Sequence, residues 1–233
     1  MNSNKKTARI AGMWYLLLAI FSGFSMMYVD STLYVTGDAA ATVSRIRESE
    51  WLFRLGFVSN LIGQTCFLFL AHALYKLFES VDKSQARLMV ILIVASVPVT
   101  CLDMLNQFAP ILLLSGAGYL SAFEPAQLNA LAMVFLDMHR HGYVIAEIFW
   151  GLWLLPFGLL VFKSGFIPKV LGVLLMIGCF GYLIECLTTL LFPDYTMITY
   201  PGIAIAAVAE FSLIFWLLLK GVKDQKPDPI VAS

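Results

Sequence analysis

The sequence predicts an all-α fold: a polytopic integral membrane bundle of six transmembrane helices, with cytoplasmic N- and C-termini and two short amphipathic helices on the outer face. Three observations lead to this prediction. The chain of 233 residues is 60% hydrophobic and only 13% charged, a balance that soluble domains of this size do not have. The hydrophobic residues form six separate segments. The basic residues are distributed unevenly between the connections that join those segments.

Each apolar segment is long enough to cross a bilayer, because a transmembrane helix needs about 20 mostly apolar residues. Such runs are too long for outer-membrane barrel strands, which alternate in polarity over about 10 residues. The predicted spans are residues 10–29, 53–77, 88–114, 143–162, 170–192 and 203–219. We expect residues 1–222 to form a single transmembrane domain and residues 223–233 to form a disordered cytoplasmic tail.

Lysine and arginine residues predict the orientation, because cytoplasmic loops carry an excess of them. With a cytoplasmic N-terminus, eleven of these residues lie inside and four lie outside. The inner ones are Lys5, Lys6, Arg9, Lys76, Lys83, Arg87, Lys163, Lys169, Lys220, Lys223 and Lys226. The outer ones are Arg45, Arg47, Arg54 and Arg140. Both termini are therefore predicted to be cytoplasmic.

Two longer connections lie on the predicted outer side, and each contains a helix signal. Asp38 is a suitable N-cap for a helix that runs to about Ser49. Pro125 suits the first turn of a second helix, to about Met138, in which apolar residues recur at helical spacing. We expect this second helix to lie flat on the membrane interface.

Four acidic residues fall inside the predicted spans: Asp103, Glu147, Glu185 and Glu210. A charge at the centre of a bilayer helix costs roughly 2.5–3.5 kcal/mol on insertion scales, so these side chains need partners or water. At 1.5 Å per helical residue, most of the polar groups fall in the outer half of the membrane. The sequence therefore predicts a polar pocket that opens outward. Its candidate ligand-binding residues are Arg54, Asp103, Gln107, Glu147, Glu185 and Glu210.

Each of these residues also has a structural interpretation. Arg54 could form a plain ion pair that holds its helix in register, and Asn60 and Gln64 are typical of hydrogen bonds between transmembrane helices. An enzymatic interpretation stays open as well, with a divalent metal near the outer leaflet and a metal-bound water that attacks a lipid ester or amide. Its candidate ligands are Asp103, His139, His141, Glu147 and Glu185.

Several segments together resemble a family of uncharacterised bacterial membrane proteins known as the domain of unknown function four-three-eight-six. They are KTARIAG (residues 6–12), GDAAA (37–41), LFRLG (52–56), FWGLWLLPFG (149–158, preceded by His141 and Gly142) and SGFIPKVLG (164–172). The resemblance covers nearly the whole chain. It implies a six-helix, multi-pass protein of the bacterial cytoplasmic membrane and implies no particular activity.

Three functions remain as hypotheses. The first is a binding or transport bundle, whose pocket holds a small polar ligand, a cation or a proton. The second is an accessory membrane protein, in which the polar residues only determine helix packing. The third is the metal-dependent lipid hydrolase. The sequence contains no phosphate-binding loop, Rossmann fingerprint, nucleophile elbow or zincin helix, and no basic aromatic patch for nucleic acid. It names no cofactor, and the lipid bilayer is its expected partner.

Overall fold

A computed structural model describes residues 3–222, and these residues form helices joined by short connections. The elements in chain order are α1 (Ser3–Gly23), η1 (Phe24–Val29), α2 (Asp30–Leu33), α3 (Ala39–Glu48), α4 (Glu50–Phe78), α5 (Lys83–Leu113), η2 (Gly118–Ala122), α6 (Pro125–Leu152), α7 (Leu154–Ser164), α8 (Lys169–Leu191), η3 (Pro193–Thr199), α9 (Tyr200–Phe215) and η4 (Trp216–Lys220). The predicted all-α fold is confirmed. The predicted tail of residues 223–233 lies outside the described residues.

Six helical segments are long and apolar enough to cross a membrane, as predicted. They are Asn4–Leu33, Glu50–Phe78, Lys83–Leu113, Pro125–Ser164, Lys169–Leu191 and Pro193–Lys220. Most are longer than the apolar runs, because the helices continue through the polar residues that flank each run. A helix can continue past the apolar run, because its hydrogen bonds are formed by the backbone and not by the side chains.

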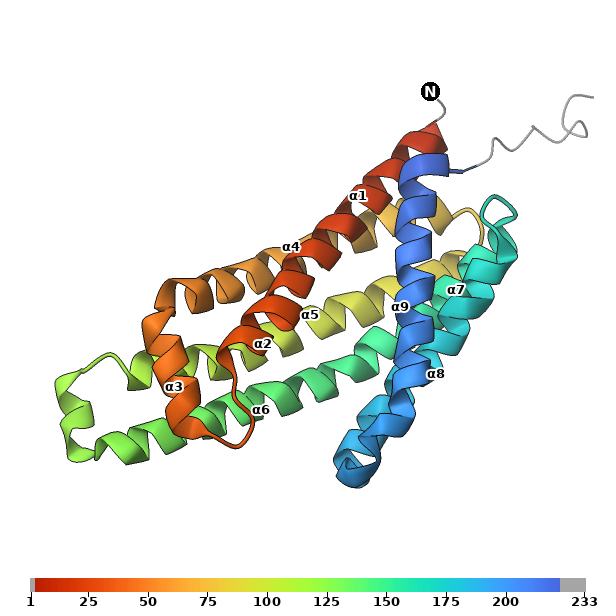
Figure 1. The fold of residues 1–233 in the computed structure, drawn as a ribbon. Coiled ribbons are helices and arrows are strands. Elements are labelled where there is room, and N and C mark those ends of the chain that lie inside the picture. The colour runs from red at the N-terminus through yellow and green to blue at the C-terminus, as the bar shows by residue number, and fades with distance from the viewer. Residues whose placement is uncertain (1–2, 223–233) are drawn as a thin grey trace, which may run out of the picture.

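Neighbouring segments in the sequence pack as neighbours in space. α1 lies along α4, α4 along α5, α5 along α6, α7 along α8 and α8 along α9. α1 also contacts α9 and η4, so Ser3 and Lys220 lie at the same end of the bundle (Figure 1). We call this the inner end and the opposite one the outer end, following the predicted orientation.

Two apolar clusters of buried side chains lie at different levels of the bundle. The larger fills the inner half and includes Leu74, Phe78 and Phe157, with the rings of Phe78 and Phe157 5.8 Å apart. The smaller lies near the outer end and includes Val29 and Phe53. The buried polar residues of α4, α5 and α6 lie between them.

The two predicted outer helices have different outcomes. The first is present as α3, and the Asp38 side chain accepts a hydrogen bond from the backbone N–H of Ala41 at 2.9 Å, as an N-cap does. The second helix begins at Pro125 as predicted, but it is not a separate interfacial helix, since residues 125–138 are the first part of α6 and continue without interruption into the fourth span. This part of α6 contacts α3 and α5, and its buried residues are Ala132 and Leu136, whereas the predicted apolar face is partly exposed.

Three spans depart from a regular α-helix. The sixth begins with the 3₁₀-helix η3 and ends in the π-helix η4. The first contains the π-helix η1 close to the polar level of the bundle. The fourth changes from α6 to α7 at Trp153. Pro156 lies three residues beyond, and a proline lacks the N–H that would bond the carbonyl four residues earlier. The sequence interpretation contained no broken helix.

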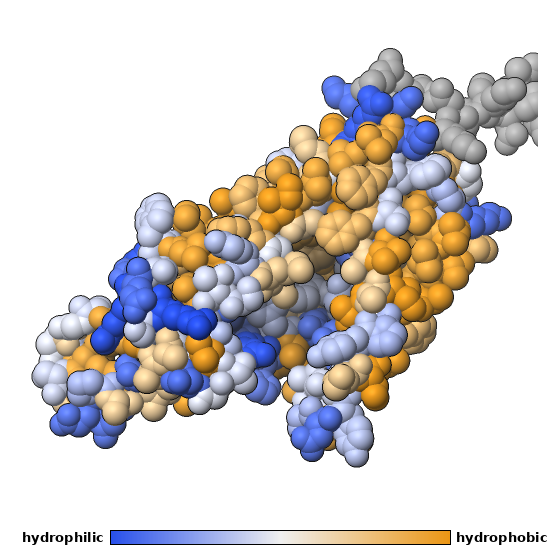
Figure 2. Space-filling view, in the orientation of Figure 1, coloured by the Kyte–Doolittle hydropathy of each residue, from blue (hydrophilic) through white to orange (hydrophobic). Residues whose placement is uncertain are grey.

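The outer end of the bundle is divided into two parts. One contains α3 with the outer halves of α5 and α6, and the other contains the outer ends of α8 and α9 with η3 (Figure 1). Figure 2 shows that the surface is hollowed between these two parts, and that hydrophilic residues lie along the hollow. The hollow therefore lies between α6 on one side and α8 and α9 on the other (Figure 1, Figure 2).

Candidate functional site

One face of α6 carries the central polar residues of the bundle. His139, Tyr143 and Glu147 follow one another at intervals of four, so their side chains lie on the same side of the helix. At 1.5 Å per residue, this line of three polar side chains extends about 12 Å along the helix. His139 and Tyr143 are buried and Glu147 is partly buried.

His139 contacts the carboxyl group of Asp103 on α5. The Nδ1 atom of His139 lies 2.7 Å from Oδ2 of Asp103, and both side chains are more than nine-tenths buried. Asn106 donates a hydrogen bond from Nδ2 to the other carboxylate oxygen at 3.2 Å. Both oxygens of the buried acid therefore have partners.

Gly142 makes room for this acid. A methyl group added at Gly142 would overlap the carboxyl group of Asp103. The glycine therefore allows α6 to approach α5 closely enough for His139 to reach Asp103. This is a close-packing role of the kind that small residues have at interfaces between transmembrane helices.

Tyr143 connects the same face of α6 to α4. Asn60 donates a hydrogen bond from Nδ2 to the Tyr143 hydroxyl oxygen at 2.5 Å, and Gln64 donates one to Asn60 Oδ1 at 3.4 Å. The Tyr143 ring also packs edge-on against the His139 ring, with centroids 4.8 Å apart. Asp103, His139, Tyr143, Asn60 and Gln64 are connected in this way. Together with Gln107, one turn beyond Asp103 on α5, they form the group that we call the upper cluster.

The upper cluster contains buried polar atoms without a partner among the described residues. They include Nε2 of His139, Oε1 of Gln64, and both polar atoms of the Gln107 side chain, which is 1% exposed. Gln107 lies one turn beyond Asp103 on α5. Buried polar atoms in proteins nearly always have hydrogen-bond partners, so unpaired ones indicate a place where a ligand or water binds.

A second group of acids lies deeper along α6. Glu147 interacts electrostatically with Glu185 of α8, and Oε2 of Glu147 has no partner among the described residues. Glu210 of α9 accepts hydrogen bonds from the hydroxyl groups of Tyr15, at 2.5 Å, and Tyr182, at 3.1 Å. Tyr182 interacts electrostatically with all three glutamates. We call Glu147, Glu185 and Glu210, with the two tyrosines, the lower cluster.

Charged residues lie beside the upper cluster, towards the outer end. Asp30, which follows η1, interacts electrostatically with His139 and Arg140. The Arg140 guanidinium lies 4.6 Å from the centre of the Tyr34 ring, and the Tyr34 hydroxyl group donates a hydrogen bond to Asp137 at 2.6 Å. Burial and this hydrogen bond raise the pKa of Tyr34. Arg140 therefore lies next to the acids of this region.

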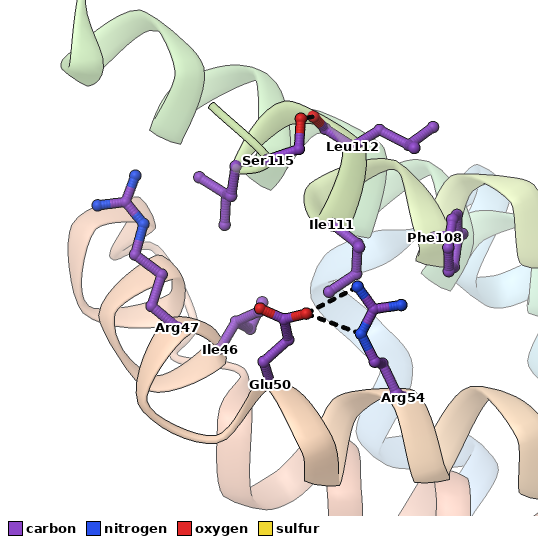
Figure 3. A pocket seen from close by; sticks show the side chains of 9 residues that line it. Ile46, Arg47, Glu50, Arg54, Phe108, Ile111, Leu112 and Ser115 are labelled. Atoms are coloured by element: carbon purple, nitrogen blue, oxygen red, sulfur yellow. Dashed lines mark hydrogen bonds and ion pairs between the residues drawn. The ribbon is translucent and has the colours of Figure 1, made fainter. Parts of the chain in front are cut away.

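The structure does not bring Arg54 to the predicted acids. Its guanidinium pairs with Glu50, one turn earlier on the same helix, at 2.7 Å. Both residues lie in a separate pocket between α3, α4 and α5, shown in Figure 3. Asp103 and Gln107 belong to the upper cluster, and Glu147, Glu185 and Glu210 belong to the lower cluster. The single predicted pocket is thus replaced by two groups connected by one face of α6.

The five candidate metal ligands are also separated. Only Asp103 and His139 are in contact, while His141 is exposed and its Nδ1 lies 2.8 Å from the backbone oxygen of Asp137. Within residues 3–222, no group of three or more histidine, cysteine, aspartate or glutamate side chains is arranged to hold a metal ion.

Several residues of these clusters were not predicted from the sequence. His139 was considered only as a candidate metal ligand, and Tyr15, Tyr182, Gly142 and Asp30 were given no role. A usable signal existed for His139, because it lies four and eight residues before Tyr143 and Glu147. No local pattern marks Tyr15 and Tyr182, which meet Glu210 only through tertiary contacts.

The fold and these clusters define a multi-pass α-helical membrane protein with polar groups inside the bundle. A family model described as Domain of unknown function (DUF4386) matches residues 10–221, and the chain belongs to this family. An uncharacterized protein from Archaeoglobus fulgidus is 40% identical over 83 residues, which are 34% of this chain and 46% of that protein. The match therefore spans about half of that relative. No solved structure matches the chain significantly.

Proposed function

We propose that this membrane protein binds a small cation or a proton in the lower cluster, and that the line of polar residues on α6 connects this site to the outer end. The role would be that of a transporter or a receptor for a small ligand. The observation that carries the proposal is the absence of a basic partner. Within residues 3–222, no lysine, arginine or histidine forms an ion pair with Glu147, Glu185 or Glu210.

Electrostatics supports a positively charged ligand. Glu147 and Glu185 interact with each other inside a layer where ionised groups are costly. Two neighbouring carboxylates repel, and a bound cation or proton removes that repulsion while it also gives the free Oε2 atom of Glu147 a partner. Intramembrane acids of this kind commonly line ion or proton pathways.

The hollow at the outer end supports access to the site. It lies between the part that contains α6 and the part that contains α8 and α9, and these are the helices that supply the lower cluster (Figure 2). The partial exposure of Glu147 and Glu185 agrees with such a route. With the predicted orientation, the route opens away from the cytoplasm of a bacterial cell.

The first test is thermal unfolding of the purified protein in a mild detergent, with sodium, potassium, magnesium or calcium chloride against choline chloride. A cation that binds should stabilise the protein, by about 2.7 kcal/mol at 100 times its Kd. Glu147→Gln and Glu185→Gln should abolish this response. Glu79→Gln, at an exposed position beyond α4, is the matched control and should retain it.

Proton binding needs a separate measurement, because it does not make the thermal stability depend on which salt is added. The infrared band of a protonated carboxyl group should appear as the pH is lowered and should be smaller in Glu147→Gln than in Glu79→Gln. If neither the cation response nor this band differs between the wild type and the Glu147→Gln, Glu185→Gln double variant, the proposal is wrong.

One observation favours the accessory role for part of the lower cluster. Both oxygens of Glu210 already accept hydrogen bonds, from Tyr15 and Tyr182. These bonds connect α1, α8 and α9, so Glu210 is suited to hold these helices together. Glu210→Gln should therefore lower stability more than it lowers any cation response.

A further inference from the structure

A separate pocket lies at the outer end, on the surface of the part that contains α3. It has a volume of about 480 Å³, within the range of about 300–1,000 Å³ usual for small-molecule sites. Figure 3 shows Arg54 and Glu50 pointing towards each other from α4, Phe108 and Ile111 on α5 facing them, and Arg47 of α3 at the edge. None of these residues belongs to the upper or lower cluster.

The polar side of this pocket carries an unbalanced positive charge. Glu50 Oε1 accepts from Nε of Arg54 and also lies 2.7 Å from its Nη2, so this carboxylate is matched to one arginine. Arg47 forms no hydrogen bond or ion pair with any residue in the described range 3–222. Two arginines and one glutamate therefore line the pocket: Arg54 is turned towards Glu50, whereas the exposed Arg47 lies at the edge with its side chain pointing away from that pair (Figure 3).

The opposite side of the pocket is apolar. Phe108, Ile111 and Leu112 line it from the outer end of α5, and the Arg54 guanidinium lies 6.0 Å from the centre of the Phe108 ring. Trp51, next to Glu50, is 73% exposed, as is typical of an aromatic residue at a membrane interface. The pocket thus combines arginine side chains with an apolar wall at the outer ends of α4 and α5, beside a tryptophan of the kind that lies at membrane interfaces.

We propose that this pocket binds the phosphate group of an anionic phospholipid, with Arg47 and Arg54 contacting the phosphate and the Phe108–Leu112 wall contacting the first carbons of an acyl chain. Arginine suits this task because its planar guanidinium donates two parallel hydrogen bonds to phosphate oxygens. Glu50 holds Arg54 in position and limits the attraction for anions. This site is independent of the function proposed for the lower cluster.

The test is titration of the purified protein, in a neutral detergent, with phosphatidylglycerol and separately with phosphatidylcholine, followed by native mass spectrometry. Phosphatidylglycerol should bind more tightly than phosphatidylcholine. Arg47→Gln and Arg54→Gln should each weaken phosphatidylglycerol binding about tenfold, the effect of losing a charge-assisted contact. Arg45→Gln is the matched control, since it removes the same charge from α3 outside the pocket, and it should bind like the wild type.

Glu50→Gln gives a change in the opposite direction that unfolding could not imitate. Loss of the carboxylate frees Arg54, so phosphatidylglycerol should bind several-fold more tightly. Equal binding of the two lipids, or wild-type binding by both Arg47→Gln and Arg54→Gln, overturns the proposal. Glycerol phosphate and inorganic phosphate are titrated as well, to distinguish a lipid from a soluble phosphate. If either binds as tightly as phosphatidylglycerol with the same dependence on Arg47, the ligand is a soluble phosphate and the lipid proposal is wrong.

Discussion

His139 and Asp103 meet 2.7 Å apart between α5 and α6, and the contact is possible because Gly142 brings the two helices close together. The pair uses Nδ1 of the imidazole, so Nε2 remains without a partner among the described residues. A histidine held in this way has one fixed nitrogen and one available nitrogen, and the available one faces the interior of a membrane bundle.

The first prediction concerns Gly142. Gly142→Ala should destabilise the protein by about 1–3 kcal/mol, because the new methyl group overlaps the carboxyl group of Asp103. Gly23→Ala is the matched control. Gly23 also has helical backbone angles but no atom near an added methyl group, so this change should stabilise by about 0.5–1 kcal/mol. Thermal unfolding in detergent measures both, and equal effects would contradict the packing role of Gly142.

The second prediction concerns the contact between His139 and Asp103. His139→Ala leaves the buried carboxyl group of Asp103 with only Asn106, and should cost about 1–3 kcal/mol of stability. His141→Ala, two residues away on the exposed side of α6, should change stability by less than about 0.5 kcal/mol. Denaturant unfolding of the two variants provides the comparison. A small effect of His139→Ala would mean that the pair is not formed.

The third prediction concerns the tyrosine hydroxyls on Glu210. Tyr15→Phe and Tyr182→Phe each remove one hydrogen bond to a carboxyl group and should destabilise by about 1.5–3 kcal/mol. The control is Tyr28→Phe, because the Tyr28 side chain is 55% exposed and stacks on Phe24 in a way that phenylalanine preserves. If all three variants unfold at the same temperature, the hydroxyl groups do not hold Glu210.

The fourth prediction concerns pH at the inner end. The Lys163 ammonium group and the backbone N–H of Gln85 hydrogen-bond the Asp82 carboxylate and lower its pKa in the folded protein. A lowered pKa stabilises the fold above the unfolded value of about 3.9, and this contribution disappears as the pH falls through the folded value. Asp82→Asn keeps an N-cap side chain without the charge.

Thermal unfolding between neutral and acid pH tests this prediction. The difference in stability between the wild type and Asp82→Asn should shrink below about pH 4, since both then carry a neutral side chain at position 82. Lys163→Gln should reproduce the acid-dependent part of the effect. A difference that stays constant down to the lowest pH would show that Asp82 acts only as a helix cap.

Hydropathy was sufficient to predict the six spans because each must shield its backbone from lipid over a fixed thickness. It was not sufficient for α6. The apolar spacing of Leu128, Leu131 and Phe135 is the same for a helix on the membrane surface and for one that packs on α3 and α5. Only tertiary contacts distinguish the two.

The site was predictable as a set of buried acids but not as a geometry. Depth along each helix placed Asp103 and Glu147 correctly inside the bundle, yet depth does not determine which way a side chain points. Arg54 is an example: its position on the helix was predicted, but its side chain pairs with Glu50 one turn earlier and not with the acids inside the bundle. That pairing was visible in the sequence as an i, i+4 spacing of opposite charges.

The hydrogen bond from Tyr15 to Glu210 joins residues 195 positions apart. During synthesis, Tyr15 in the first span can therefore form this hydrogen bond only after the last span, which contains Glu210, has been made. Until then Tyr15 lacks its acceptor, and α1 is held mainly by α4. During biosynthesis the protein thus passes through a five-span stage with an open flank. A chain that stops before α9 should remain in that stage and become a substrate for membrane quality control.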